Sequence, residues 1–123
     1  MIEGNTAIDN RGKVTFINDF DMSDVKRFYM VENHQEGFIR AWHGHKKEAK
    51  YVFVPTGAAL IMVKDMETGE KEEYYMSSRK PQVLYIPPGK YNGSMSLKEN
   101  TKIMYFSTST LEESKADDYR EEI

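Results

Sequence analysis

The feature that most constrains the fold of this chain is a series of short apolar segments separated by turn signals. Many of these segments are rich in aromatic and β-branched residues, which is typical of strands. Turns containing proline or glycine separate several of them, at 55–57, 67–69 and 87–89. Strands that recur about every 8–12 residues predict an all-β sandwich or barrel. The eight segments are KVTFI, DVKRFYMVEN, GFIRAWHGH, AKYVFVP, AALIMVKD, EKEEYYM, QVLYIPP and TKIMYFSTS.

The C-terminal stretch TLEESKADDYREEI, residues 110–123, is the one segment with helical character. Its high charge and small apolar content indicate a short, exposed helix or a frayed end. The stretch METGEKEEYY, residues 66–75, resembles a β-hairpin. A chain of 123 residues is long enough for one core and too short for two, so we expect a single domain over 1–123.

Composition excludes several classes of protein. The net charge of −3 argues against a general nucleic-acid binder, which carries a basic excess. The absence of cysteine excludes disulfides and thiolate zinc sites. The N-terminus lacks the apolar core of a signal peptide, and no apolar run approaches the ~18 residues that a membrane span needs. We therefore expect a cytoplasmic protein with no membrane and no nucleic-acid partner.

A His-x-His pair lies in the segment GFIRAWHGH, residues 37–45. Side chains alternate between the two faces of a strand, so His43 and His45 share one face. Arg40 points to the other face of a regular strand, and to the same face if a β-bulge intervenes. Lys50 begins the next predicted strand. Because burying imidazoles and cations together for packing alone is costly, we expect them to line a cleft for anionic groups.

The spacing of these residues resembles the first motif of the cupin family. In that motif Gly37 is followed after five residues by His43, after one more by His45, and later by Gly57. The stretch PPGKYNG, residues 87–93, resembles the second motif. With the helical tail, the resemblance implies an all-β cupin jelly roll with a short C-terminal helix.

Metal-binding cupins take two histidines and a glutamate from the first motif and a histidine from the second. In this chain the glutamate position falls on Lys50 and the second-motif histidine position on Asn92. An ammonium group repels a divalent cation, and an amide is a poor substitute for imidazole. His34 and Glu48 are other potential ligands, but they lack the motif spacing. We therefore expect neither a metal nor another cofactor, since metal sites of this kind use three or more protein ligands.

A more specific resemblance covers nearly the whole chain. It is to the metal-free cupins that isomerise nucleotide-linked deoxysugars, in which two branches compete. The DNRG stretch at 9–12 is similar to the start of both branches. The stretches at 33–43 and 86–93 resemble dTDP-4-dehydrorhamnose 3,5-epimerases, and Tyr105 falls where these enzymes keep a catalytic tyrosine.

The second branch is that of the dTDP-4-keto-6-deoxyglucose 3,4-ketoisomerases. The stretches VKRFYMV at 25–31, HGHKK at 43–47 and DDYR at 117–120 are similar to patterns of that branch. The chain also departs from the epimerase pattern. Ala41 replaces a glycine, Asn92 replaces a histidine and His45 replaces a glutamine. The region that gives the epimerase its carboxylate partner for the histidine base has no counterpart here.

Both branches begin with the same chemistry, because a 4-keto group acidifies the C–H bond at C3 of the sugar. The resemblance implies that His43 is the general base, as suits an imidazole, and that Lys50 stabilises the enolate. Tyr105 is the acid that an epimerase would use, and His45 is the one a ketoisomerase would use. Candidate substrate-binding residues, with the arginines matching diphosphate oxygens, are Arg40, Arg11, Arg27, Asn92 and His34.

The sequence thus predicts a nucleotide-sugar isomerase, with 3,5-epimerisation ranked before 3,4-ketoisomerisation. A third candidate is a cupin that binds a sugar nucleotide without catalysis, and a fourth is a metal-dependent cupin. The resemblance also implies a homodimer whose N-terminal strand crosses to the neighbouring subunit. In that case Arg11 would serve the partner's site.

Overall fold

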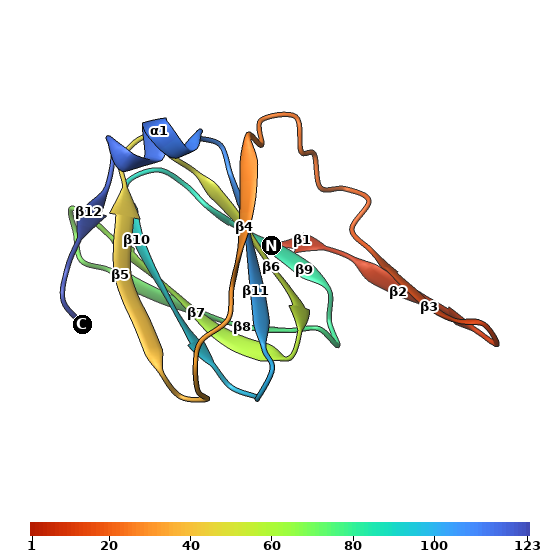
Figure 1. Cartoon of the computed structure of the whole chain (residues 1–123). Coiled ribbons are helices and arrows are strands. Elements are labelled where there is room, and N and C mark those ends of the chain that lie inside the picture. The colour runs from red at the N-terminus through yellow and green to blue at the C-terminus, as the bar shows by residue number, and fades with distance from the viewer.

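Two five-stranded antiparallel sheets make up the body of the protein, and a two-stranded arm projects from it (Figure 1). The computed structural model describes all residues, 1–123. In spatial order, the first sheet contains β1 (Ile2–Glu3), β9 (Gln82–Ile86), β6 (Lys50–Thr56), β11 (Lys102–Ser107) and β4 (Arg27–Val31). The second contains β12 (Tyr119–Arg120), β5 (Ile39–His45), β10 (Lys90–Ser96), β7 (Ala58–Asp65) and β8 (Lys71–Ser77). The expected all-β fold is confirmed.

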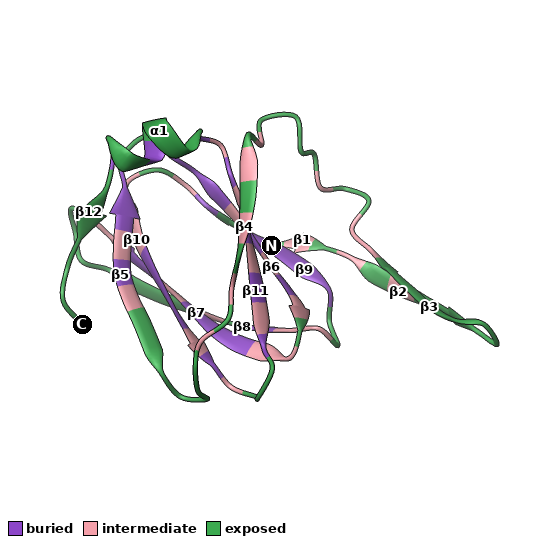
Figure 2. Cartoon of the chain, in the orientation of Figure 1, coloured by how far each residue is buried: buried purple, intermediate pink, exposed green.

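The core lies between the two sheets, where buried residues are concentrated on the strands of the body (Figure 2). Alternation decides which polar side chains also face inward. On β6, Lys50 shares the inner face with the buried Val52 and Val54. On β11, Tyr105 shares it with Ile103. The buried core residues are Val52, Val54, Ala59, Ile61, Val63, Met76, Leu84, Ile86, Ile103 and Tyr105.

Each of the eight predicted segments contains a strand, and the predicted hairpin joins β7 to β8. Four strands were not predicted, namely β1, β2, β10 and β12. The strand β10 has the sequence KYNGSMS, whose polar residues and glycine carry no strand signal. It forms because β5 and β7 pair with it on both sides. Tertiary hydrogen bonding here overrides local propensity.

The C-terminal segment contains a short, largely exposed helix, the first of the two predicted alternatives, and then a strand that was not predicted. The helix α1 (Leu111–Lys115) is indeed short, and Thr110 caps it in a capping box with Glu113. Beyond it, β12 joins the edge of the second sheet and places Arg120 opposite His43. This one helix falls far short of the length and apolar character that a membrane-crossing helix needs.

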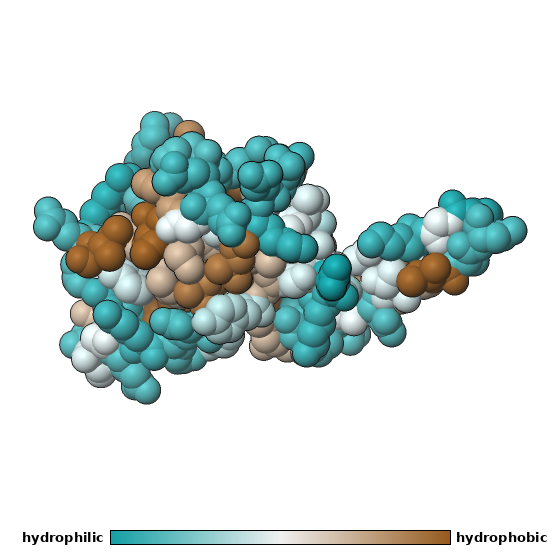
Figure 3. Space-filling view, turned by 90° about the horizontal axis from the view of Figure 1, so that it is seen from below, coloured by the Kyte–Doolittle hydropathy of each residue, from teal (hydrophilic) through white to brown (hydrophobic).

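The arm is the hairpin of β2 (Asn5–Asp9) and β3 (Gly12–Phe16), which extends away from the body (Figure 1). Two of its apolar residues are largely exposed, Ile8 at 77% and Val14 at 64%. In the space-filling view, apolar surface is visible both on the arm and on the body (Figure 3). The arm therefore contributes nothing to the core of its own chain.

Candidate active site

A cavity of about 260 Å³ opens between the two sheets beside α1. It is lined by side chains from both sheets and from the C-terminal segment, and only three of its fourteen lining residues are hydrophobic. Six residues singled out from the sequence meet in it, namely Arg40, His43, His45, Lys50, Asn92 and Tyr105. The sequence therefore located the cavity, although the roles of these residues stay predictions.

Arg40 reaches the cavity because β5 contains a β-bulge. In the register with β10, His43 pairs with Asn92, but Arg40 pairs with Ser94, so β5 has one residue more than β10 between these pairs. The extra residue turns Arg40 to the same face as His43, the second of the two predicted orientations. Close approach at the bulge requires Gly93, because a Cβ there would lie 2.6 Å from the Cβ of Ala41.

His43 is a half-buried imidazole in a cationic setting. Burial lowers its pKa below the ordinary 6.5, and the charges of Arg120, Lys50 and Arg40 lower it further. Asn92 donates a hydrogen bond from Nδ2 to the carbonyl oxygen of His43, at 3.2 Å. The imidazole is consequently neutral at neutral pH, which is the state that a general base requires.

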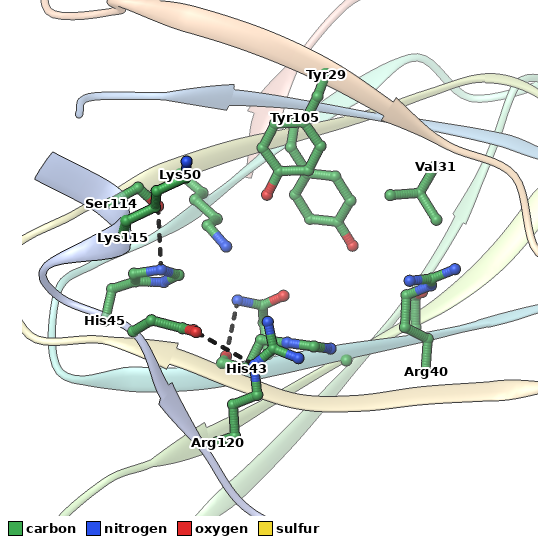
Figure 4. Close-up of a pocket in the computed structure, with 14 residues that line it drawn as sticks. Tyr29, Val31, Arg40, His43, His45, Lys50, Tyr105, Ser114, Lys115 and Arg120 are labelled. Carbon is green, nitrogen blue, oxygen red and sulfur yellow. Dashed lines mark hydrogen bonds and ion pairs between the residues drawn. The ribbon is translucent and has the colours of Figure 1, made fainter. Parts of the chain in front are cut away.

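His45 is buried deeper, beneath α1 (Figure 4). Its Nε2 lies 3.3 Å from the hydroxyl oxygen of Ser114 and 3.6 Å from a carboxylate oxygen of Glu48. The other carboxylate oxygen of Glu48 lies 3.9 Å from the ammonium of Lys50. Burial lowers the pKa of both His45 and Lys50, and Glu48 opposes this effect on each.

Two tyrosines face the histidines from the opposite sheet (Figure 4). Tyr105 and Tyr29 stack with ring centroids 5.2 Å apart and an interplanar angle of 13°. Burial raises the pKa of Tyr105 to about 12 and also raises that of Tyr29, so both phenols are protonated at neutral pH. Lys50 Nζ lies 5.8 Å from the centroid of the Tyr105 ring. The cavity thus has proton donors on one side and neutral imidazoles on the other.

Three of the predicted substrate-binding residues lie outside this cavity. Arg11 is at the tip of the arm, paired with Asp9 and with 86% of its side chain exposed, so it cannot serve the cavity of its own chain. Arg27 places its guanidinium carbon 5.0 Å from the centroid of the Tyr29 ring but does not line the cavity. His34 is exposed and lines a separate polar cavity.

Sequence reasoning missed the residues that the C-terminal segment brings to the cavity, which are Ser114, Lys115, Asp118 and Arg120. Asp118 accepts a hydrogen bond from Nε of Arg120 at 3.3 Å (Figure 4). A signal was present, because DDYR at 117–120 was noted as similar to ketoisomerases. The residues of this stretch were not predicted to line the site, because the C-terminal segment was expected to be an exposed helix or a frayed end.

No group of three or more His, Cys, Asp or Glu side chains has a geometry that would hold a metal ion. His43 and His45 both line the cavity. The two positions where metal-binding cupins have a glutamate and a further histidine are occupied here by Lys50 and Asn92, which also line it. The donor set is that of a proton-transfer or anion-binding site.

Comparison with known proteins identifies the family. A protein-family model described as "FdtA: WxcM-like, C-terminal" matches residues 1–122. The chain belongs to this FdtA/WxcM-like family. The match covers the arm, both sheets and the C-terminal segment, and it agrees with the cupin relationship expected from the sequence.

A curated relative is the spore coat polysaccharide biosynthesis protein SpsL of Bacillus subtilis (strain 168), 34% identical over 90 residues. The aligned region makes up 68% of this chain and 60% of SpsL, so the chain spans less than two thirds of that relative.

Solved structures with the same fold include both branches of sugar isomerase. The dTDP-4-dehydrorhamnose 3,5-epimerase of Bacillus anthracis, solved with TDP and PPi bound, has a TM-score of 0.82 at 20% identity. That match covers 96% of this chain and 75% of the epimerase. The 3,4-ketoisomerase QdtA of Thermoanaerobacterium thermosaccharolyticum, solved with TDP, has a TM-score of 0.77 at 21% identity, covering 98% of this chain and 85% of QdtA. At these identities the likeness establishes the fold.

Proposed function

We propose that this protein isomerises a nucleotide-linked 4-keto-6-deoxy sugar and that His43 is the general base. The dTDP-linked sugar is the most direct substrate with which to test this. The observation that carries the proposal is a neutral, half-buried imidazole in a cavity that four cationic side chains and two tyrosines also line. The family match and the epimerases and ketoisomerases that share the fold support the same substrate class.

The chemistry follows from the charges around His43. A ketone at C4 acidifies the C3–H bond, and removal of that proton leaves negative charge on the carbonyl oxygen. Lys50 is a buried ammonium on the cavity wall, where shielding from bulk water strengthens its attraction for an enolate oxygen. Arg40 and Arg120 supply guanidinium groups that match diphosphate oxygens.

Epimerisation is the reaction that the geometry supports best. It requires an acid on the face of the sugar ring opposite the base. Tyr105 belongs to the other sheet, faces His43 across the cavity and is protonated at neutral pH. A sugar ring bound between β5 and β11 would lose a proton to His43 and regain one from Tyr105, with inversion at C3 and then at C5.

Ketoisomerisation is the second candidate, favoured by His45. This residue lines the cavity two positions after His43 on the same strand, so the two imidazoles lie on one side of a bound sugar. A proton taken from C3 by one imidazole and returned to C4 on the same face, with the hydroxyl proton of O3 passing to O4, would move the carbonyl from C4 to C3.

Incubation with dTDP-4-keto-6-deoxyglucose in deuterated water tests the proposal. Deuterium at both C3 and C5, read by NMR and mass spectrometry, supports epimerisation, and migration of the carbonyl to C3 supports ketoisomerisation. Tight binding of the sugar nucleotide without any deuterium exchange would contradict catalysis and indicate a protein that only binds a sugar nucleotide. Elemental analysis that finds a stoichiometric metal needed for turnover would contradict the metal-free mechanism.

Two variants separate the two reactions. In an epimerase, Tyr105→Phe should allow proton loss from C3 but block its return from the opposite face. In a ketoisomerase, His45→Asn should block carbonyl migration. Time courses of deuterium incorporation against product formation distinguish these outcomes.

A further inference from the structure

Glu48 is a buried carboxylate that the proposed mechanism does not use. Its side chain has no exposed surface, and neither carboxylate oxygen has a hydrogen-bond partner. A carboxylate without hydrogen bonds is costly to bury, and nearby cations are the usual compensation. Here the nearby cation is Lys50, whose ammonium lies 3.9 Å from one carboxylate oxygen, and the imidazole of His45 lies 3.6 Å from the other. Both of these side chains line the cavity.

The backbone around Glu48 is fixed by two distant segments. Asp117 accepts hydrogen bonds from the backbone N–H groups of Lys46, Lys47 and Glu48, at 3.0, 2.8 and 3.1 Å. The next residue, Ala49, donates from its backbone nitrogen to the hydroxyl oxygen of Thr108 at 2.9 Å. The C-terminal segment and Thr108, which directly follows β11, together fix the backbone that carries the Glu48 side chain.

The position of Glu48 bears on the proton of His45. The ring nitrogen nearest the carboxylate is Nε2, which also lies 3.3 Å from the hydroxyl oxygen of Ser114. An N–H group aimed at a carboxylate is attracted to it, whereas a nitrogen lone pair in the same place is repelled. The proton of a neutral His45 therefore belongs on Nε2, which leaves Nδ1 as the nitrogen that can accept a proton.

We propose that Glu48 is a positioning residue, which fixes the His45 proton on Nε2 and keeps Lys50 protonated without touching the substrate. Its role in turnover rests on the proposed function. His45 then exchanges protons through Nδ1, and Lys50 keeps the positive charge that the enolate needs. The site departs from a simple His-x-His pair, since Glu48, His45 and Lys50 act as one charged unit.

The surrounding charges set the direction of the expected effects. Burial is the largest influence on both His45 and Lys50, and it lowers both pKa values. Glu48 is the strongest of the groups that raise them. The other charged groups acting on the pair are Asp117, Asp118 and Arg27. Loss of the Glu48 charge should therefore lower the pKa of His45 and release the Lys50 proton more easily.

NMR of the histidine ring nitrogens in the full chain, labelled with ¹⁵N, tests this role directly. In the wild type, His45 should be in the Nε2–H form. In Glu48→Gln the His45 pKa should fall by about one unit, the shift expected from an opposite charge at this distance, and the tautomers should mix. His43 serves as an internal reference, because Glu48 is not among the groups that shift its pKa. The matched control is Glu73→Gln, an exposed residue on β8.

The wild-type measurement alone can overturn the proposal, since an Nδ1–H form of His45 would contradict it even if Glu48→Gln failed to fold. An unchanged pKa in Glu48→Gln would do the same. With dTDP-4-keto-6-deoxyglucose, Glu48→Gln should shift the pH profile of turnover, and Glu48→Asp should restore it in part. A wild type with the expected tautomer but no turnover would contradict the proposed function and leave the Glu48 assignment intact.

Discussion

His43 is a half-buried imidazole that three strands surround with positive charge. Arg40 lies on the same strand as His43, β5, whereas Lys50 lies on β6 and Arg120 on β12. Burial lowers the pKa of His43 most, and each of these three positive charges lowers it further. A base with a lowered pKa stays neutral, and so active, at pH values below the ordinary 6.5. Its neighbours therefore widen the pH range in which His43 can accept a proton.

Replacement of the base should abolish exchange. In His43→Asn, the C3 proton of the 4-keto sugar has no acceptor, and we expect exchange to slow by about 1000-fold, a typical contribution of a general base. Deuterium incorporation from deuterated water measures this loss. Exchange at a near wild-type rate would show that another group is the base.

The cationic setting of His43 predicts a specific pH effect. The acid limb of the pH–rate profile reports protonation of the base, so activity should fall as pH drops through the lowered pKa. Arg120→Gln removes the neighbouring charge with the largest effect on His43, and the acid limb should move to higher pH. Arg79→Gln, an exposed arginine outside the cavity, is the matched control and should leave the limb in place.

At the scale of elements, the C-terminal segment is a wall of the cavity. Ser114 from α1 contacts His45, and β12 pairs Arg120 with His43. The backbone nitrogen and carbonyl of Trp42 pair with Glu121, which extends this edge by one residue. Residues some 70 positions apart thus complete one site, and the cavity depends on how well this segment is attached.

Asp117 is the anchor of that attachment. Burial by itself would raise its pKa, but the three backbone N–H groups that donate to it lower the pKa below 3.8. A lowered pKa means that this stabilisation is present at neutral pH and is lost as pH falls through the folded-state value. Asp117→Asn should cost about 2 kcal/mol of unfolding free energy, since it weakens hydrogen bonds to a charged acceptor. Urea denaturation at pH 7 measures the cost, and a value near zero would contradict the anchoring role.

At the surface of the whole molecule, several large apolar side chains are exposed. On the outer face of the first sheet, Phe28 is 64% and Met30 50% exposed, and aromatic contacts run across this face from Phe28 to Phe106, 6.0 Å between centroids. The arm adds the exposed Ile8 and Val14. Surfaces of this kind mark interaction sites, and they support the homodimer that the sequence resemblance implied.

We expect the protein to sediment as a dimer and Phe28→Glu to shift it toward the monomer, because a charge would be buried in an apolar interface. Tyr75→Glu is the matched control. Tyr75 is 70% exposed on β8 of the other sheet, so its replacement should leave the dimer intact. Analytical ultracentrifugation at several concentrations measures both, and a monomeric wild type would contradict the dimer.

Strand alternation and motif spacing are local properties of a chain, and for this reason the all-β fold and six cavity residues could be predicted from the amino-acid sequence. The period of two placed His43 and His45 on one face, the cupin spacing led to Lys50 and Asn92, and the resemblance to 3,5-epimerases led to Tyr105. The remaining features of the site depend on pairing between distant segments, so they could be seen only in the folded chain. Only the register with β10 shows the bulge that turns Arg40 inward, and only the docked C-terminal segment brings Arg120 to His43 and buries Glu48 beside His45. Such contacts join residues far apart in the chain, and their free energy depends on burial and charge that no local pattern encodes.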